Sequence, residues 1–154
     1  MGNKGRENKL ENDLFFVCSI IEHIGRITKN KRGEVVAKLG EKEISRLLEL
    51  ADILHCEPIE ATSGRLIERC GLNEGDFDNV ALCKYTVPTH FDIAKVYKRL
   101  IAELVKTQNI SLLDALTNVY TSWISDKIDD YNSSMYFENP QYLYASYTAG
   151  EAIT

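Results

Sequence analysis

Three aspartates near the end of the chain have a spacing that suggests a binding surface. Asp126, Asp129 and Asp130 stand at positions i, i+3 and i+4, so a helix would place them on one face. They fall at the end of an expected helix, where the helix dipole disfavours negative charge. Such a face can bind a cation or a basic partner. The alternative is an acidic face that contacts only water, because exposed charges at a screened surface cost little.

Tyrosine dominates the region that surrounds these acids. Six of the eight tyrosines lie between residues 120 and 147, together with Trp123 and Phe137. A tyrosine carries a large apolar ring and a polar tip, which suits either a segment packed over a helical core or a surface that holds a partner. Helical spacing assigns Tyr120 and Trp123 to the core. The predicted partner-binding surface therefore consists of Asp126, Asp129, Asp130, Tyr131, Tyr136, Tyr142, Tyr144 and Tyr147.

Cysteine and histidine are the other residues that could do chemistry. His90, followed by Asp92, could act as a base toward Cys70 or Cys83, which would give a cysteine nucleophile. No family signature surrounds these cysteines, and the sequence has no phosphate-binding loop, metal-ligand pair or nucleophile elbow. We therefore predict no catalytic, cofactor-binding or metal-binding residue. A protein without enzymatic activity is favoured, and a cysteine-dependent enzyme is the alternative.

The composition is typical of a globular helical protein. The 154 residues are 44% hydrophobic and 27% charged, a length that suits one domain with a sizeable core. No apolar run precedes Leu14, so we expect neither a secretory signal nor a membrane span, and we predict a cytoplasmic location. The four cysteines form no Cys-x-x-Cys pair and are expected to be reduced, mostly buried thiols.

The charge distribution indicates the kind of partner. Residues 107–154 hold six acids and a single base, Lys127, so the whole net charge of −5 falls in this third of the chain. A surface of this charge repels phosphate backbones and attracts basic proteins. We therefore expect a protein partner, for which a basic surface would suit this charge, and we expect neither nucleic acid nor membrane. Association of identical chains is left open.

The elements that position these residues are read from helical spacing and turn residues. Residues 1–11 are predicted to be a flexible tail, and residues 12–154 a single helical domain whose first helix is capped by Asn12. Gly40 and Gly71 are expected to end helices. Residues 80–87 have β-type composition and suggest a short extended segment. Three further helix starts are marked by Thr89 with Asp92, Ser111 with Asp114, and Asn139 before Pro140.

A possible DNA-reading motif has the wrong spacing. Residues 36–47 resemble a helix-turn-helix, but Ala37 stands three residues before Gly40 and Ile44 only four after it. The second helix would also begin with Glu41 and Glu43, which would face phosphates. DNA binding through residues 26–46 is therefore the weaker alternative.

The first 65 residues or so resemble a group of small, uncharacterised bacterial helical proteins. The similarity rests on the apolar run Phe15-Phe16-Val17-Cys18-Ser19-Ile20, on Leu47-Leu48-Glu49 and on Asp52-Ile53-Leu54-His55. Genes of such proteins often lie near toxin and antitoxin genes, so the resemblance implies a bacterial accessory protein. It transfers no catalytic residue.

Taken together, these features predict an all-α protein that binds another protein. The expected fold is a compact bundle of about five to seven helices, with the aromatic C-terminal segment packed across it. The expected function is that of an antitoxin-like or immunity-like neutraliser, or of an adaptor, that uses the acidic, tyrosine-rich C-terminal surface.

Overall fold

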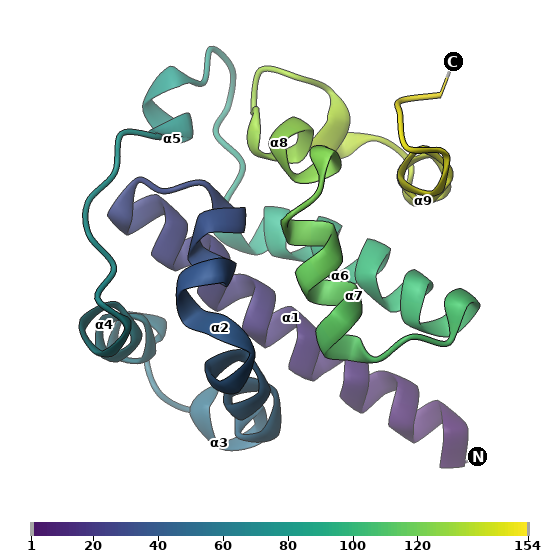
Figure 1. The fold of residues 1–154 in the computed structure, drawn as a ribbon, viewed down its shortest axis with the longest axis horizontal. Coiled ribbons are helices and arrows are strands. Elements are labelled where there is room, and N and C mark those ends of the chain that lie inside the picture. Colours follow the sequence, from purple (N-terminus) through teal and green to yellow (C-terminus); the bar gives the residue numbers. More distant parts are fainter. Residues whose placement is uncertain (1, 154) are drawn as a thin grey trace.

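The fold is built from helices alone in the part of the chain that the structure describes. The computed structural model describes residues 2–153, with side chains from residue 8 onward. The helices are α1 (Gly2–Thr28), α2 (Arg32–Glu49), α3 (Ala51–Leu54), α4 (Ile59–Cys70), α5 (Asn79–Leu82), α6 (His90–Gln108), α7 (Leu112–Tyr120), α8 (Trp123–Asp129), the 3-10 helix η1 (Met135–Phe137) and α9 (Pro140–Ala149). The prediction of a compact all-α bundle is confirmed (Figure 1).

Helix α1 forms the axis of the bundle. It packs most extensively against α6 and also contacts α2 and α4 (Figure 1). Leu14, Val17, Ile21 and Ile24 recur at helical spacing on α1 and are completely buried. Each such side chain contributes about 1.5–3 kcal/mol through the removal of its surface from water. The repeated apolar face therefore explains why α1 lies at the centre.

Most of the predicted helix boundaries are confirmed. Thr89 and Asp92 form a complete capping box at the start of α6, and Ser111 accepts a hydrogen bond from the amide of Asp114 at the start of α7. Asn139 caps α9 directly before Pro140. Gly71 ends α4 in the left-handed conformation.

Gly40 breaks α2 into two parts, as the sequence predicts. Its φ of 76° and ψ of 167° are non-helical, so the helix kinks at this residue. A residue with a side chain would be strained at this φ. The kink lets Leu39 and Ile44, on either side of it, both reach the core.

Two predictions about boundaries are wrong. Helix α1 begins at Gly2, so Asn12 lies inside it and caps nothing; the expected flexibility of residues 1–11 stays a prediction. The suggested extended segment at residues 80–87 is also wrong in its first part, because α5 covers Asn79–Leu82. Asp78 caps this short helix by accepting a hydrogen bond from the amide of Ala81.

The helix that starts after Ser111 does not continue to the three aspartates, as its apolar spacing suggested, but is interrupted. Thr121 and Ser122 donate their hydroxyls to the carbonyls of Thr117 and Val119, at 2.6 and 2.7 Å. Such hydrogen bonds compete with the helical ladder. Ser122 is extended, with φ −96° and ψ 172°, and α8 starts after it in a new direction.

The C-terminal aromatic segment packs across the bundle, as predicted. Helix α9 and η1 both contact α6, and Leu143 and Ser146 of α9 are buried. The hydroxyls of Tyr144 and Thr107 lie 2.9 Å apart and join α9 to the end of α6. The segment is therefore docked on the core.

The structure also tests the expectations about buried cysteines and about membrane spans. All four cysteines are free thiols, but only Cys18 is buried, so the expectation of mostly buried thiols is wrong. Across residues 2–153, no helix combines the length and the apolar character that a bilayer crossing requires.

Candidate functional site

The three aspartates that suggested a common face do not share one. Helix α8 ends at Asp129, and Asp130 follows in an extended conformation with φ −83° and ψ 97°. Asp126 is exposed and lies 3.8 Å from the ammonium of Lys31, while Asp130 is exposed at the surface of the following turn. Asp129 is only 2% exposed. The predicted acidic surface therefore loses Asp129, because this residue points into the core instead of into water.

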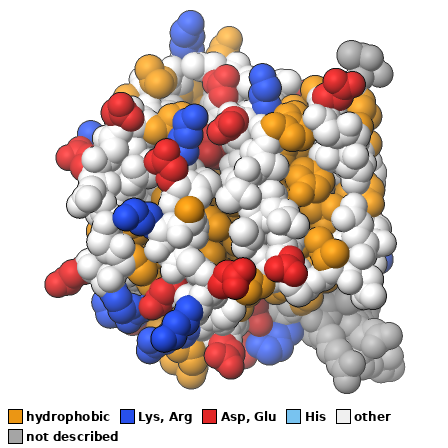
Figure 2. All heavy atoms as spheres, viewed as in Figure 1, with side chains coloured by type: hydrophobic (Ala, Val, Ile, Leu, Met, Phe, Trp, Pro, Cys, Tyr) orange, Lys and Arg blue, Asp and Glu red, His pale blue; other side chains and the backbone are white. Residues whose placement is uncertain are grey.

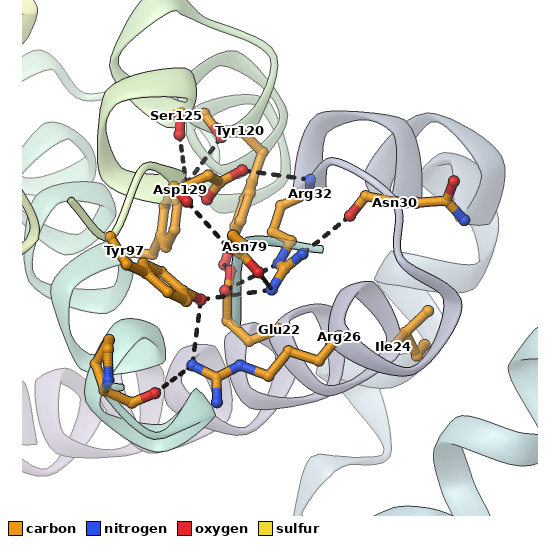
Figure 3. Close-up of polar contacts among 12 residues, drawn as sticks. Glu22, Ile24, Arg26, Asn30, Arg32, Asn79, Tyr97, Tyr120, Ser125 and Asp129 are labelled. Carbon is orange, nitrogen blue, oxygen red and sulfur yellow. Dashed lines mark hydrogen bonds and ion pairs between the residues drawn. The ribbon is translucent and has the colours of Figure 1, made fainter. Parts of the chain in front are cut away.

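Asp129 belongs to a buried polar network between the helices. Its Oδ1 accepts a hydrogen bond from the hydroxyl of Tyr97 at 2.8 Å, and its Oδ2 accepts one from the backbone amide of Arg32 at 3.4 Å. The Tyr97 hydroxyl also lies 2.8 Å from Oγ of Ser125. Figure 3 shows these residues converging from α2, α6 and α8.

An ion pair between Arg32 and Glu22 forms the centre of the network. Both side chains are completely buried, and Nε of Arg32 donates to Oε1 of Glu22 at 3.2 Å. The rest of the guanidinium donates to the carbonyl of Asn30 at 2.9 Å and to Oδ1 of Asn79 at 3.4 Å (Figure 3). It also donates to the hydroxyl of Tyr131 at 3.4 Å. Such complete pairing offsets the large cost of removing a charge from water.

Two stacked tyrosines complete the network. Tyr120 donates its hydroxyl to the second oxygen of Glu22 at 3.3 Å. Its ring stacks on that of Tyr97, with centroids 4.0 Å apart and planes inclined by 15°. The side-chain amide of Asn79 donates to the carbonyl of Asp129 at 2.9 Å. The network therefore connects α1, α2, α5, α6, α7 and α8.

Two glycines provide the space that this network needs. A Cβ at Gly25 of α1 would lie 2.4 Å from Cδ and 2.6 Å from Nε of Arg32. A Cβ at Gly33 of α2 would lie 2.7 Å from the carbonyl oxygen of Tyr120. Both distances are far below ordinary contact distances. Glycine at these positions therefore lets the guanidinium lie directly on α1 and lets α2 approach the end of α7.

Burial shifts the titration of both carboxyl groups. It raises the pKa of Glu22 to about 7 and that of Asp129 to about 6, although the positive charge of Arg32 opposes both shifts. Burial likewise raises the pKa values of Tyr97 and Tyr120 well above the ordinary value. The positive charge of Arg32 thus acts on two carboxyl groups in an enclosed site, although only Glu22 is hydrogen-bonded to the guanidinium. Because Glu22 and Arg32 are wholly inaccessible to solvent, this arrangement holds helices together and offers no opening to a substrate.

Tyr131 is a second predicted surface residue that the structure buries. Its ring lies 5.3 Å from the guanidinium carbon of Arg26, and its hydroxyl accepts a hydrogen bond from Arg26 at 3.2 Å. Tyr136 meets Tyr131 edge to face at 5.8 Å, and Phe137 meets Tyr136 in the same way at 5.0 Å. Phe137 is 67% exposed. A series of aromatic contacts therefore runs from the buried network to the surface.

The remaining predicted tyrosines are half-buried. Tyr136, Tyr142, Tyr144 and Tyr147 all pack against the core with part of each side chain still exposed. Tyr144 also lines a groove of about 530 Å³ between α1, α6 and α9, whose apolar residues include Leu10 and Val105. In the space-filling view, hydrophobic side chains gather beside α9, on the right of the molecule (Figure 2). The partner-binding role of these tyrosines stays a prediction.

The structure does not assemble the cysteine site that served as the alternative. The ring of His90 lies 5.2 Å from that of His23 and 4.1 Å from that of Phe91, and its buried Nε2 has no hydrogen-bond partner within residues 2–153. The thiol of Cys83 donates instead to the carbonyl of Tyr85 at 3.4 Å. Burial raises the pKa of the Cys70 thiol, which disfavours the reactive thiolate. The geometry therefore gives no support to a cysteine nucleophile.

Sequence reasoning missed Glu22 and Arg32, the two central residues of the network. One signal was present: Glu22 interrupts the apolar face that Cys18 and Ile21 form on α1. A charged residue on a buried face requires a partner. Arg32 gave no comparable signal, because it stands in the basic segment of residues 29–32 that resembles an exposed turn.

Comparison of the chain with protein-family models, with curated proteins and with solved structures finds no match in any of the three.

Proposed function

We propose that this protein is a cytoplasmic bacterial protein that binds another protein and has no enzymatic activity of its own. Its role would be that of an antitoxin-like or immunity-like neutraliser, or of an adaptor. The residues that would contact the partner form the C-terminal surface, which consists of Asp126, Asp130, Tyr136, Phe137, Tyr142, Tyr144 and Tyr147. Asp129 and Tyr131 are omitted from it because they are buried.

The exposed ring of Phe137 is the observation that carries this proposal. Two-thirds of this side chain contacts solvent, and it lies against the half-exposed ring of Tyr136. Aromatic residues are enriched at protein interfaces, where burial of their rings supplies much of the binding energy. An exposed phenylalanine supported by a fixed tyrosine can enter a pocket on a partner at little cost in side-chain entropy.

The charge around this ring favours a basic partner. Glu138 directly follows Phe137, Asp130 precedes it by seven residues, and Lys127 is the only base among residues 107–154. Asp126 contributes less because Lys31 lies beside it. Complementary charge mainly accelerates association and is screened by salt.

Site-specific crosslinking tests the position of the interface. A photoreactive benzoylphenylalanine would replace Phe137 in one variant and Ile53 in another. Ile53 is a matched control, because it is 69% exposed and lies on α3, away from the C-terminal segment. We expect a specific crosslinked protein in the native cell for the first variant and not for the second. Equal crosslinking at both positions, or none at residue 137, would contradict the proposed interface.

Charge variants test the proposed steering on the partner found in this way. The double substitution Asp130→Asn and Glu138→Gln is compared with Glu41→Gln and Glu49→Gln, which removes the same charge from α2. We expect the first pair to slow association about three-fold to tenfold at low salt, with little difference at high salt. A similar effect of both pairs would mean that only the net charge matters.

A further inference from the structure

A second cavity lies on another part of the molecule and has a different chemistry. It has a volume of about 500 Å³, is partly open to solvent, and lies between α1, α3, the segment that joins α3 to α4, and the first residues of α4 and α6. Phe15, Phe16, Ile59 and Phe91 contribute apolar side chains to its wall. The rings of Phe15 and Phe91 lie 6.1 Å apart, and Phe91 remains 47% exposed. The volume falls in the range of cavities that bind small molecules.

Carboxylates surround this aromatic wall. Asp13, Asp52 and Glu57 all line the cavity. Glu57 is engaged elsewhere, since it accepts hydrogen bonds from Arg65 and Thr62. Asp13 and Asp52 are therefore the two acids available at the rim. Anionic ligands are repelled by this arrangement, whereas a cation gains both from the carboxylates and from the faces of the aromatic rings.

The chain's own Lys9 shows that the two acids can hold one ammonium group. Nζ of Lys9 lies 3.0 Å from Asp13 and 2.9 Å from Asp52, which join α1 to α3. Asp13 and Asp52 thus stand at the correct separation for a single ammonium. The lysine is largely exposed, and exposed ion pairs are weak because water screens them. A ligand that also buries an apolar body against the phenylalanines can therefore displace it.

We propose that this cavity binds an organic ammonium compound with an apolar body, and that Lys9 occupies the ammonium position when no ligand is bound. The ammonium of the ligand contacts Asp13 and Asp52, and its apolar part lies against Phe15 and Phe91. The proposal is independent of the proposed function, because the cavity shares no residue with the C-terminal surface.

Binding of three related probes to the full chain tests this proposal. Phenylbutylammonium, phenylbutanol and phenylbutanoate have similar apolar parts and differ in charge. Binding is followed by the amide NMR signals of Phe15 and Asp52. We expect the ammonium compound to bind about twofold to fivefold more tightly than the alcohol, since its ammonium adds contacts to two carboxylates at an exposed rim. Equal binding of the alcohol, or binding of the carboxylate, would overturn the proposed charge selectivity.

Substitutions of Asp13, Asp52 and Lys9 distinguish a site that recognises the ammonium group from a cavity that binds only the apolar part of the ligand. Asp13→Asn with Asp52→Asn should weaken binding of phenylbutylammonium about twofold to fivefold, while the charge-matched pair Glu41→Gln and Glu49→Gln should leave it unchanged. Lys9→Met removes the internal competitor and should tighten binding several-fold. If Lys9→Met binds the probe equally or more weakly, Lys9 does not compete with the ligand. If the Glu41 and Glu49 variant loses binding, the ligand does not lie at Asp13 and Asp52. Circular dichroism establishes that each variant is folded before its result is used.

Discussion

Replacing Gly25 by alanine should destabilise the protein, although alanine is the better helix former. An alanine Cβ would stand 2.4, 2.6 and 2.8 Å from Cδ, Nε and Cζ of Arg32. Arg32 is completely buried and held by Glu22, Asn30, Asn79 and Tyr131, so it cannot move aside freely. The added methyl group therefore strains the centre of the network.

Two destabilising contributions and one stabilising contribution determine the change in the free energy of unfolding. Overpacking a well-packed core costs about 1–3 kcal/mol, and alanine returns up to about 1 kcal/mol through helix propensity. If the strain separates Arg32 from Glu22, an unpaired buried charge raises the cost to about 3–5 kcal/mol. We therefore expect Gly25→Ala to lower the free energy of unfolding by up to about 4 kcal/mol, and not to raise it as helix propensity alone would. In a chain of this length each kcal/mol lowers the melting temperature by about 2–4 °C.

Gly64 provides the matched control. It lies inside α4, and a Cβ there would meet nothing within 4 Å. Gly64→Ala should therefore raise the free energy of unfolding by about 0.5–1 kcal/mol, through helix propensity alone. Urea denaturation followed by circular dichroism measures both variants. If Gly25→Ala stabilises the protein as Gly64→Ala does, the guanidinium does not lie where the structure places it.

Three further predictions concern the network and the thiols. Arg32→Met leaves Glu22 and Asp129 buried without their cation and should cost about 3–5 kcal/mol in urea denaturation; a loss under about 1 kcal/mol would contradict the pairing. Burial raises the pKa of Glu22 from 4.5 to about 7. Between these two pH values the folded state binds more protons than the unfolded state, so the free energy of unfolding falls as the pH rises. Glu22→Gln removes this contribution, so the variant should lose less stability than the wild type between pH 4.5 and about pH 7. Burial lowers the pKa values of His23 and His90, which has the opposite effect on stability and the same size in both proteins. Iodoacetamide at neutral pH should label the exposed Cys56 and leave Cys18 unlabelled, because Cys18 is buried and its pKa is raised by burial. Labelling of Cys18 in the native protein, detected by mass spectrometry, would contradict its burial.

Local signals in the sequence were sufficient for most helix boundaries. A cap such as Thr89 with Asp92, or a glycine such as Gly40, acts on atoms at most a few residues away, so its effect can be predicted from neighbouring residues in the sequence. The break at Thr121 and Ser122 was missed because the apolar spacing continues through it. Only the hydroxyls bonded to backbone carbonyls reveal it.

The candidate surface was predicted less well, because its residues are placed by distant contacts. The spacing of Asp126, Asp129 and Asp130 assumes a helix that continues, whereas α8 ends within the group. Asp129 is drawn inward by Tyr97 and Arg32, which stand 32 and 97 residues away in sequence. Tyr131 is buried by Arg26, at a separation of 105 residues. No local pattern contains these pairings.

The long separations within the network also determine when it can form during synthesis. Glu22 and Arg32 leave the ribosome 10 residues apart, but Asp129, which accepts from the backbone amide of Arg32, and Tyr131, which accepts from its guanidinium, follow Arg32 by 97 and 99 residues. At about 5–20 residues per second, this delay is roughly 5–20 s. During that interval the first helices carry an ion pair whose later partners have not been made. A chaperone that shields nascent chains would therefore meet this protein with its centre incomplete until Tyr131 has emerged.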